Sequence, residues 1–328
     1  MRRREFIWLL GARLTWPVAA PAQQAGRTYR LGCLLPQTRD EFGNEAFFEE
    51  LRRGGFTEGQ NLTVEWRAYG QHVDLIPQYA AELVKAPVDV ITTGGEEAIR
   101  ATQLATETIP IVAIGGDMLG YGLVNSLARP GGNTTGVSIL ANDAEGKRQD
   151  ILIEAVPGLR KMAVLADVNF INTFERVKYQ FDALQEAAHA HNIEFSIHQV
   201  ARAEEIAAAI DSAQVSGATA LNIVSSPLFY AHRHLIMDRA ATARLPTIHE
   251  FPETAEEGGF AAYGPRLSEL FSEIMSRQII ELFRGIKVAD IPVEQPTKFE
   301  LVINLKTAKA MGMTVPAALL ARADKVIE

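Results

Sequence analysis

Cysteine is almost absent from this 328-residue chain, which contains Cys33 alone. A single cysteine excludes an intrachain disulfide framework, and because Cys33 lies within an apolar stretch we expect a buried structural thiol. The seven histidines do not suit a metal site either. The pairs His189/His191 and His232/His234 are spaced i, i+2, which points their members to different faces of a helix. We therefore expect no metal and no cofactor.

Motifs that hold phosphate or activate a nucleophile are also missing. The chain has no G-x-x-x-x-G-K-[ST] loop and no G-x-G-x-x-G turn between a strand and a helix, so Gly94-Gly95 and Gly115-Gly116 are interpreted as turn glycines. A G-x-S-x-G nucleophile motif is absent as well. These absences argue against a nucleotide-dependent enzyme and against a serine hydrolase.

Long apolar runs are confined to the amino terminus. A basic start at residues 2–4 precedes an apolar stretch from Phe6, and Ala20-Pro21-Ala22 fits the A-x-A cleavage pattern of an export signal. The letters RREF at residues 3–6 also fit a twin-arginine signal, so the Sec and twin-arginine routes both stay open. No later segment approaches a membrane span. We expect residues 1–22 to be a signal peptide, cleaved after Ala22, and the mature protein to reside in the periplasm.

The chain contains fewer basic than acidic residues, 32 against 40. The formal net charge is −8, and removal of residues 1–22 leaves 28 basic and 39 acidic residues, a net charge of −11. An acidic chain is a poor partner for nucleic acids and anionic membranes because like charges repel. We expect no nucleic-acid partner.

The most informative stretch is 88–117. Residues 88–92 form a short apolar run that ends at Gly94-Gly95, residues 96–107 have helical spacing, and a second run at 111–114 ends at Gly115-Gly116-Asp117. This order predicts a βαβ unit. The carboxyl ends of strands in open α/β sheets are where such proteins bind ligands.

The same order recurs at 218–250. An apolar strand ends at Ser225-Ser226, residues 228–244 are helical, and a short strand ends at His249-Glu250. The recurrence predicts an α/β protein with two similar Rossmann-like lobes, whose strand ends face each other across a cleft. The pattern also predicts a short helix at 119–128, a continuous helix at 267–284, and a last strand at 299–305.

Polar residues at the predicted strand ends are the candidate ligand contacts. Thr93 and the amides that open the 96–107 helix favour a carboxylate, because free N–H groups and the helix dipole meet there. Asp117 and Glu250 end equivalent strands and would accept hydrogen bonds from an ammonium group. The full set of candidates is Gln37, Thr93, Gly94, Gly95, Glu96, Gly116, Asp117, Asn169, Asn172, Ser225, Ser226, Glu250 and Tyr263. Aromatic residues near the same loops, which would stack on an aromatic body, are Phe170, Phe229, Phe251 and Tyr263.

Several stretches together identify a family. They are MRRREFIWLLG at the amino terminus, FTEGQNL at 56–62, IPIVAIGGD at 109–117, LARPGGNTTGVS at 127–138, and the run from QPTKFELVINL to RADKVIE at 295–328. The sequence closely resembles substrate-binding proteins of an ABC-transporter family with the type I periplasmic-binding-protein fold. That family includes binders of tryptophan and other aromatic amino acids.

The resemblance implies a domain plan. The first lobe comprises 28–140 and about 266–290, and the second comprises 157–264 and about 297–328. Hinge crossings are expected near 141–156, 264–266 and 290–297. The resemblance also implies a monomer that delivers a small-molecule ligand to the transmembrane subunits of an ABC permease.

Three functions remain open at this stage. The leading hypothesis is a solute receptor for a small carboxylate-bearing metabolite, namely an amino acid or a related aromatic or branched acid. A ligand-sensing receptor component would use the same fold. An extracytoplasmic enzyme using Asp117 or Glu250 is disfavoured, because no nucleophile, metal or cofactor motif accompanies these carboxylates. We therefore expect no catalytic residues.

Overall fold

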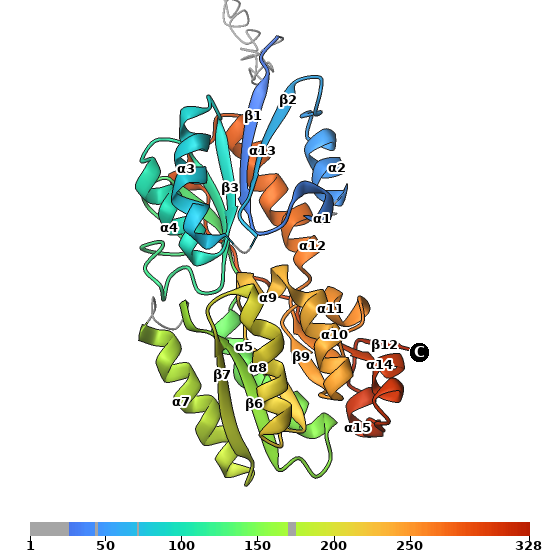
Figure 1. Cartoon of the computed structure of the whole chain (residues 1–328). Coiled ribbons are helices and arrows are strands. Elements are labelled where there is room, and N and C mark those ends of the chain that lie inside the picture. The colour runs from blue at the N-terminus through green and yellow to red at the C-terminus, as the bar shows by residue number, and fades with distance from the viewer. Residues whose placement is uncertain (1–25, 43–44, 71, 170–174) are drawn as a thin grey trace, which may run out of the picture.

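The computed structural model describes residues 26–42, 45–70, 72–169 and 175–328 of the chain. It contains one parallel and one mostly parallel β-sheet, each flanked by helices, which form an upper and a lower lobe in Figure 1. The predicted α/β class with two Rossmann-like lobes is confirmed. None of the helices in this part of the chain combines the length and the apolar character needed to cross a bilayer.

The first lobe is built on a five-stranded, fully parallel sheet of order β2-β1-β3-β4-β5. Its strands are β1 (Tyr29–Leu35), β2 (Leu62–Ala68), β3 (Val90–Gly94), β4 (Ile111–Gly115) and β5 (Thr134–Ser138). Its helices are α1 (Arg39–Phe42), α2 (Glu45–Arg53), α3 (Ile76–Lys85) and α4 (Glu96–Ala105), with a 3-10 turn at Val73–Leu75. Alternation along β1 places Cys33 in the core under α2 and Leu34 in the core under α3 and α4, as expected when helices cover both faces.

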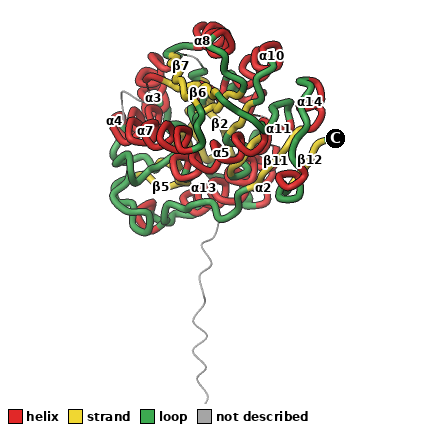
Figure 2. Tube along the Cα trace, turned by 90° about the horizontal axis from the view of Figure 1, so that it is seen from below, coloured by secondary structure: helices red, strands yellow, loops and turns green. Residues whose placement is uncertain are grey.

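The second lobe is built on a seven-stranded sheet of order β12-β11-β10-β9-β8-β6-β7. Its strands are β6 (Lys161–Asp167), β7 (Glu194–Val200), β8 (Ala220–Ile223), β9 (Thr247–His249), β10 (Ala261–Gly264), β11 (Glu300–Asn304) and β12 (Lys325–Ile327). Only β11 against β10 is an antiparallel pair among the described strands. Its helices are α5 (Ala141–Ala155), α7 (Glu175–Ala190), α8 (Ala203–Val215), α9 (Pro227–Ala231), α10 (Arg233–Ala243), α11 (Pro252–Glu256), α14 (Leu305–Ala310) and α15 (Ala317–Leu320). The carboxyl terminus lies beside β12 and α14 (Figure 2).

The chain passes between the lobes more than once. After β10 it returns to the first lobe as α12 (Leu267–Glu269), a π-helical stretch (Leu270–Met275) and α13 (Ser276–Phe283), which pack on α2 and β5. Residue Glu294 then lies beside β5, where its amide donates to the Gly136 carbonyl at 2.9 Å, before β11 joins the second sheet. Helix α5 contacts α7 and the second sheet, so the first crossing is confined to the short segment before Ala141.

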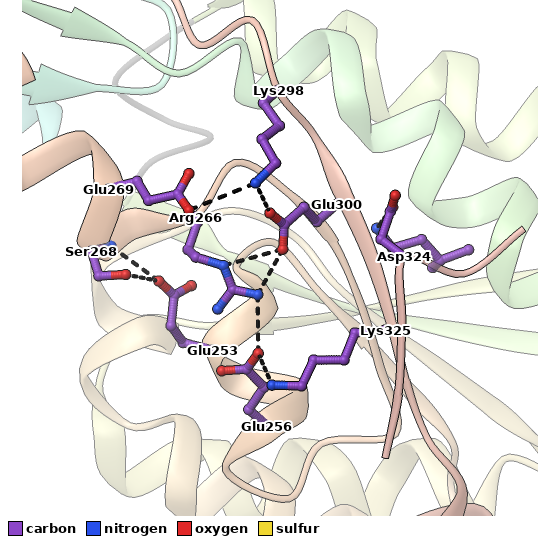
Figure 3. Close-up of polar contacts among 10 residues, drawn as sticks. Glu253, Glu256, Arg266, Ser268, Glu269, Lys298, Glu300, Asp324 and Lys325 are labelled. Carbon is purple, nitrogen blue, oxygen red and sulfur yellow. Dashed lines mark hydrogen bonds and ion pairs between the residues drawn. The ribbon is translucent and has the colours of Figure 1, made fainter. Parts of the chain in front are cut away.

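An ionic cluster joins two of these crossings (Figure 3). Arg266 donates to Glu300 at 2.6 Å and to Glu256 at 3.0 Å, and Lys298 contacts Glu300 at 2.5 Å. Arg266 stands just before α12 and Lys298 just before β11. The cluster therefore connects the second crossing and the third crossing to helix α11.

One predicted element is wrong. Residues 119–128 form turns and bends instead of a helix. The Asp117 carboxylate accepts from the Gly120 amide at 2.8 Å, and Gly122 has φ +67°. This side-chain turn and the left-handed glycine interrupt the helical path that the apolar spacing suggested.

Candidate functional site

The principal pocket lies between the lobes, at the carboxyl ends of strands from both sheets. It contains about 540 Å³ of empty space, part of it open to solvent. Its lining consists of Leu35, Pro36, Gln37, Gly94, Gly95, Glu96, Ile114, Gly115, Gly116, Ile139, Ser225, Ser226, Pro227, Tyr230, Glu250, Phe251, Leu267 and Phe271. Because the lining comes from both lobes, a small molecule held in this pocket would contact both of them.

Glu96 is the charged side chain on the first-lobe side of the pocket. It is the first residue of α4, it is 4% exposed, and its Oε1 accepts from the Gly116 amide at 2.5 Å. A Cβ at position 116 would lie 2.9 Å from this oxygen, so the glycine provides the space for the carboxyl group. Burial raises the pKa of Glu96 to about 7, and the nearby Glu250 carboxylate acts in the same direction.

Glu250 is its counterpart on the second-lobe side. It follows β9, it is 8% exposed, and its Oε2 accepts from the Ser225 hydroxyl at 2.6 Å. Its Oε1 has no hydrogen-bond partner among the described residues. Burial raises the pKa of Glu250 above its ordinary value, although the Arg148 guanidinium works against this. A buried acceptor without a partner costs free energy, so this oxygen is a natural contact for a donor on a ligand.

A fully buried ion pair supports the second-lobe side from behind. Arg148 and Glu145 of α5 are joined at 2.5 Å, with side chains 0% and 1% exposed. Glu145 Oε1 also accepts from the Ser225 amide at 2.9 Å, and Arg148 donates to the Ala141 carbonyl at 2.9 Å. The pair thereby holds the loop after β8 whose Ser225 hydroxyl contacts Glu250.

Aromatic rings provide the apolar wall of the pocket. Tyr230 and Phe251 of the second lobe meet edge to face, with ring centroids 5.2 Å apart. Leu267 and Phe271 of the returning α12 region close the wall from the first lobe. Such a wall suits a flat or apolar ligand body.

A smaller neighbouring pocket lies beside the α4 start and is also lined by both lobes. Asp167 accepts from the Ser226 hydroxyl at 2.7 Å and from the Asn169 amide at 3.0 Å. Glu97 also faces this space, and burial raises its pKa. Within the described residues, no group of three His, Cys, Asp or Glu side chains could hold a metal ion.

The structure brings most of the predicted contacts together. Those that line the principal pocket are Gln37, Gly94, Gly95, Glu96, Gly116, Ser225, Ser226 and Glu250. Of the candidate aromatic residues, Phe251 lines it, whereas Phe229 is buried in the second-lobe core. Asn172 and Phe170 lie outside the described residues.

Four predicted contacts do not line this pocket. Thr93 is fully buried within β3, which continues to Gly94. Asp117 is held in its own turn by the bond from the Gly120 amide. Asn169 faces the smaller pocket and donates to the Ala201 carbonyl at 2.9 Å. The ring of Tyr263 lies 5.9 Å from that of Phe299.

The anion site expected at the start of α4 is occupied by the protein itself. The Gly95 amide donates to the Ile114 carbonyl at 3.0 Å, and the Gly116 amide donates to the Glu96 carboxylate at 2.5 Å. No side chain of the described residues caps the amides of the helix start, but the carboxylate of Glu96, the first helical residue, lines the pocket where a ligand carboxylate was expected.

Sequence reasoning missed Tyr230, Phe271 and the Glu145–Arg148 pair. Phe271 lies far from any predicted strand end, and Tyr230 sits one helical turn beyond Ser226. The pair has the i, i+3 spacing that usually marks a solvated helix face. The apolar residues of β8 to β10 were the available sequence signal, because strands buried on both faces require a helix such as α5 to cover them.

These features define a class of protein, namely a two-lobed binding protein with a pocket between α/β lobes. The sequence profile described as ABC transporter substrate binding protein matches residues 42–327. The chain belongs to this family, whose members are non-catalytic substrate-binding proteins.

Known relatives support the assignment. A tyrosine-binding protein of Clostridioides difficile is 26% identical over 271 residues, which cover 82% of this chain and 76% of the relative. A conserved domain protein from Vibrio cholerae shares the fold with a TM-score of 0.81 at 20% identity, over 92% of this chain and 100% of the other. The ABC domain from Streptococcus pneumonia in complex with L-Trp has a TM-score of 0.77 at 19% identity, with the same coverage.

Proposed function

We propose that this chain is the extracytoplasmic solute receptor of an ABC importer. It acts as a monomer, binds an amino acid or a related aromatic or branched acid in the principal pocket, and delivers it to the permease. Family membership supports the transport role, and the tyrosine and tryptophan named for two similar proteins support an aromatic ligand. The same fold would serve a ligand-sensing component, which would need a separate signalling partner.

The observation that carries the proposal is the free oxygen of Glu250. A buried carboxylate with an unpartnered Oε1 beside an aromatic wall matches a ligand with an ammonium group and a ring. The proposed ligand contacts are Gln37, Gly94, Gly95, Glu96, Gly116, Ser225, Ser226, Tyr230, Glu250 and Phe251.

Closure of the lobes is part of the proposed mechanism. We propose that the first lobe (28–140 and about 266–290) and the second lobe (157–264 and about 297–328) rotate about crossings near 141–156, 264–266 and 290–297. Because α5 packs on the second sheet, we place the first of these bends at the start of that stretch, just before Ala141. A ligand that contacts both lobes favours the closed arrangement, and closure presents a distinct surface to the permease.

The decisive mutational test compares substitutions of two acidic residues, Glu250 and Asp117. Glu250→Gln removes the charge that faces the ligand and should weaken binding by about 2–5 kcal/mol. Asp117→Asn is the matched control, because this carboxylate caps a turn outside the pocket lining, and it should leave affinity unchanged. Calorimetry with amino acids, keto acids, aromatic acids and sugars measures both. Tight binding of a neutral sugar with none of the acids, or equal affinity in the Glu250 variant, would contradict the proposal.

Export is tested separately. We expect the mature chain to begin at Gln23, since Ala20-Pro21-Ala22 precedes it. Amino-terminal sequencing of the protein from the periplasmic fraction checks this. Recovery of an intact form that starts at Met1 from that fraction would refute cleavage.

A further inference from the structure

The charges of the pocket lining are all of one sign. Glu96 and Glu250 are acidic, and no lysine, arginine or histidine of the described residues belongs to the lining. Arg148 is 0% exposed and donates to Glu145 and to the Ala141 and Tyr263 carbonyls, so its charge acts on Glu250 from behind and its side chain does not line the pocket. A ligand carboxylate that enters this pocket therefore contacts a lining with two acidic side chains and no cationic one.

The serine hydroxyls of the lining already donate to carboxylates of the protein. The Ser225 hydroxyl donates to Glu250 at 2.6 Å, and the Ser226 hydroxyl donates to Asp167 at 2.7 Å. Each bond satisfies a buried carboxylate of the protein, and turning the hydroxyl toward a ligand would leave that carboxylate short of a donor. Neither serine is therefore a free donor for a ligand carboxylate.

Two backbone donors on the first-lobe side of the lining are used in the same way. The Gly95 amide donates to Ile114 and the Gly116 amide to Glu96, and the lining stops at Glu96, short of the next amides of α4. Two neutral side-chain donors remain in the lining, since the Gln37 side-chain amide and the Tyr230 hydroxyl make no side-chain hydrogen bond within the described residues. Two neutral donors do not compensate the desolvation of a carboxylate beside two acids.

We infer that the pocket recognises the ammonium group and the ring of its ligand, and that a ligand carboxylate adds nothing to affinity. Its substrate class then extends to aromatic monoamines, which bind at least as tightly as the matching amino acids. The inference rests on the proposed function, because it takes the principal pocket as the ligand site. The ammonium group of a monoamine can donate to the free Oε1 of Glu250, and a monoamine has no carboxylate that would have to be desolvated in the acidic pocket.

The test uses matched ligands that differ by one group. Calorimetry compares L-tyrosine with tyramine and L-tryptophan with tryptamine, and includes 3-(4-hydroxyphenyl)propionate, which keeps the carboxylate and lacks the amine. We expect each amine to bind with an affinity equal to, or about tenfold above, that of its amino acid, and the acid not to bind. These outcomes support the inference.

Two variants identify the groups involved. Glu250→Gln should weaken amine and amino acid alike, by at least about 30-fold, while the control Glu154→Gln, whose carboxylate pairs with Arg322 outside the pocket lining, should weaken neither. Gln37→Leu removes a remaining neutral donor and should change both affinities by the same factor. A selective loss of amino-acid binding in this variant would show a carboxylate contact and overturn the inference.

The outcomes separate the inference from the proposed function. If an amino acid binds and its amine binds more weakly, the inference is wrong while the proposed function stands. If no ligand of either pair binds, the proposed function fails for aromatic ligands and the inference fails with it.

Discussion

The carboxyl group of Glu96 is hydrogen-bonded within the protein. Its oxygen accepts from the Gly116 amide, and it is shielded from water by the strand ends around it. Burial disfavours the charged form of Glu96 more than the hydrogen bonds from the backbone favour it, so its pKa is raised and the protonated acid is stabilised. The residue is thus a titratable group close to neutral pH inside the pocket.

This titration makes the stability of the ligand-free protein depend on pH. The folded-state pKa of about 7 exceeds the ordinary 4.5, so the folded state binds the proton more tightly than the unfolded state. The resulting stabilisation is fully present below pH 4.5 and is lost as pH rises through 7. Glu96→Gln mimics the protonated form, and its amide oxygen can keep the Gly116 bond. We expect equal stability at about pH 4.5 and a variant more stable by up to about 3 kcal/mol at about pH 8.

Thermal unfolding of both proteins between about pH 4.5 and about pH 8 checks this, with the difference between them as the readout. A constant difference across that range would contradict a raised pKa at Glu96.

Helix α5 shows how one element supports the pocket without lining it. Its buried Glu145 and Arg148 hold the loop that carries Ser225. A buried ion pair is a weak source of net stability, but removal of one member leaves an uncompensated charge. The helix therefore couples the stability of the second lobe to the shape of the pocket.

Arg148→Met tests this role of α5. It leaves the Glu145 carboxylate buried without its cation, and we expect a loss of about 3–5 kcal/mol in the free energy of unfolding. Arg322→Met breaks an exposed pair with Glu154 and should cost no more than about 1 kcal/mol. Urea titrations measure both losses. Equal losses in the two variants would show that the buried pair has no special structural role.

At the scale of the whole molecule, the lobes meet at Gly95 and Pro227. Gly95 has φ +88°, and a Cβ there would lie 2.8 Å from Pro227 of the other lobe and 2.9 Å from the Tyr69 hydroxyl. A side chain at position 95 would therefore hold the lobes apart. Glycine allows both the backbone turn before α4 and the close approach of α9.

Gly95→Ala should weaken ligand binding by impeding closure. Part of its effect is backbone strain of about 1–2 kcal/mol, and Gly217→Ala controls for it, because Gly217 has φ +89° and a Cβ at this position would meet no atom within 4 Å. We expect both variants to lower the melting temperature, and only Gly95→Ala to lower affinity. Small-angle scattering with ligand should show a more open molecule for Gly95→Ala alone. Unchanged affinity in that variant would refute a contact-limited closure.

The α/β class, the two-lobe repeat and the strand ends that line the pocket are all predictable from the order of residues along the chain. Apolar runs that stop at small polar residues report which segments leave water and where the chain turns, and both facts are local. For this reason the sequence predicts that Gly94, Gly95 and Glu96 share one site with Ser225, Ser226 and Glu250.

The contacts of each strand-end residue depend on the folded arrangement of distant segments. Asp117 and Glu250 are equivalent in the sequence pattern, yet one caps its own turn and the other faces the pocket with a free oxygen. The difference depends on the path of the following loop and on the packing of α5 and the returning α12 region, which lie far away in the sequence. Side-chain direction and burial are set by such long-range neighbours, because a buried polar group takes whatever partner the fold brings to it.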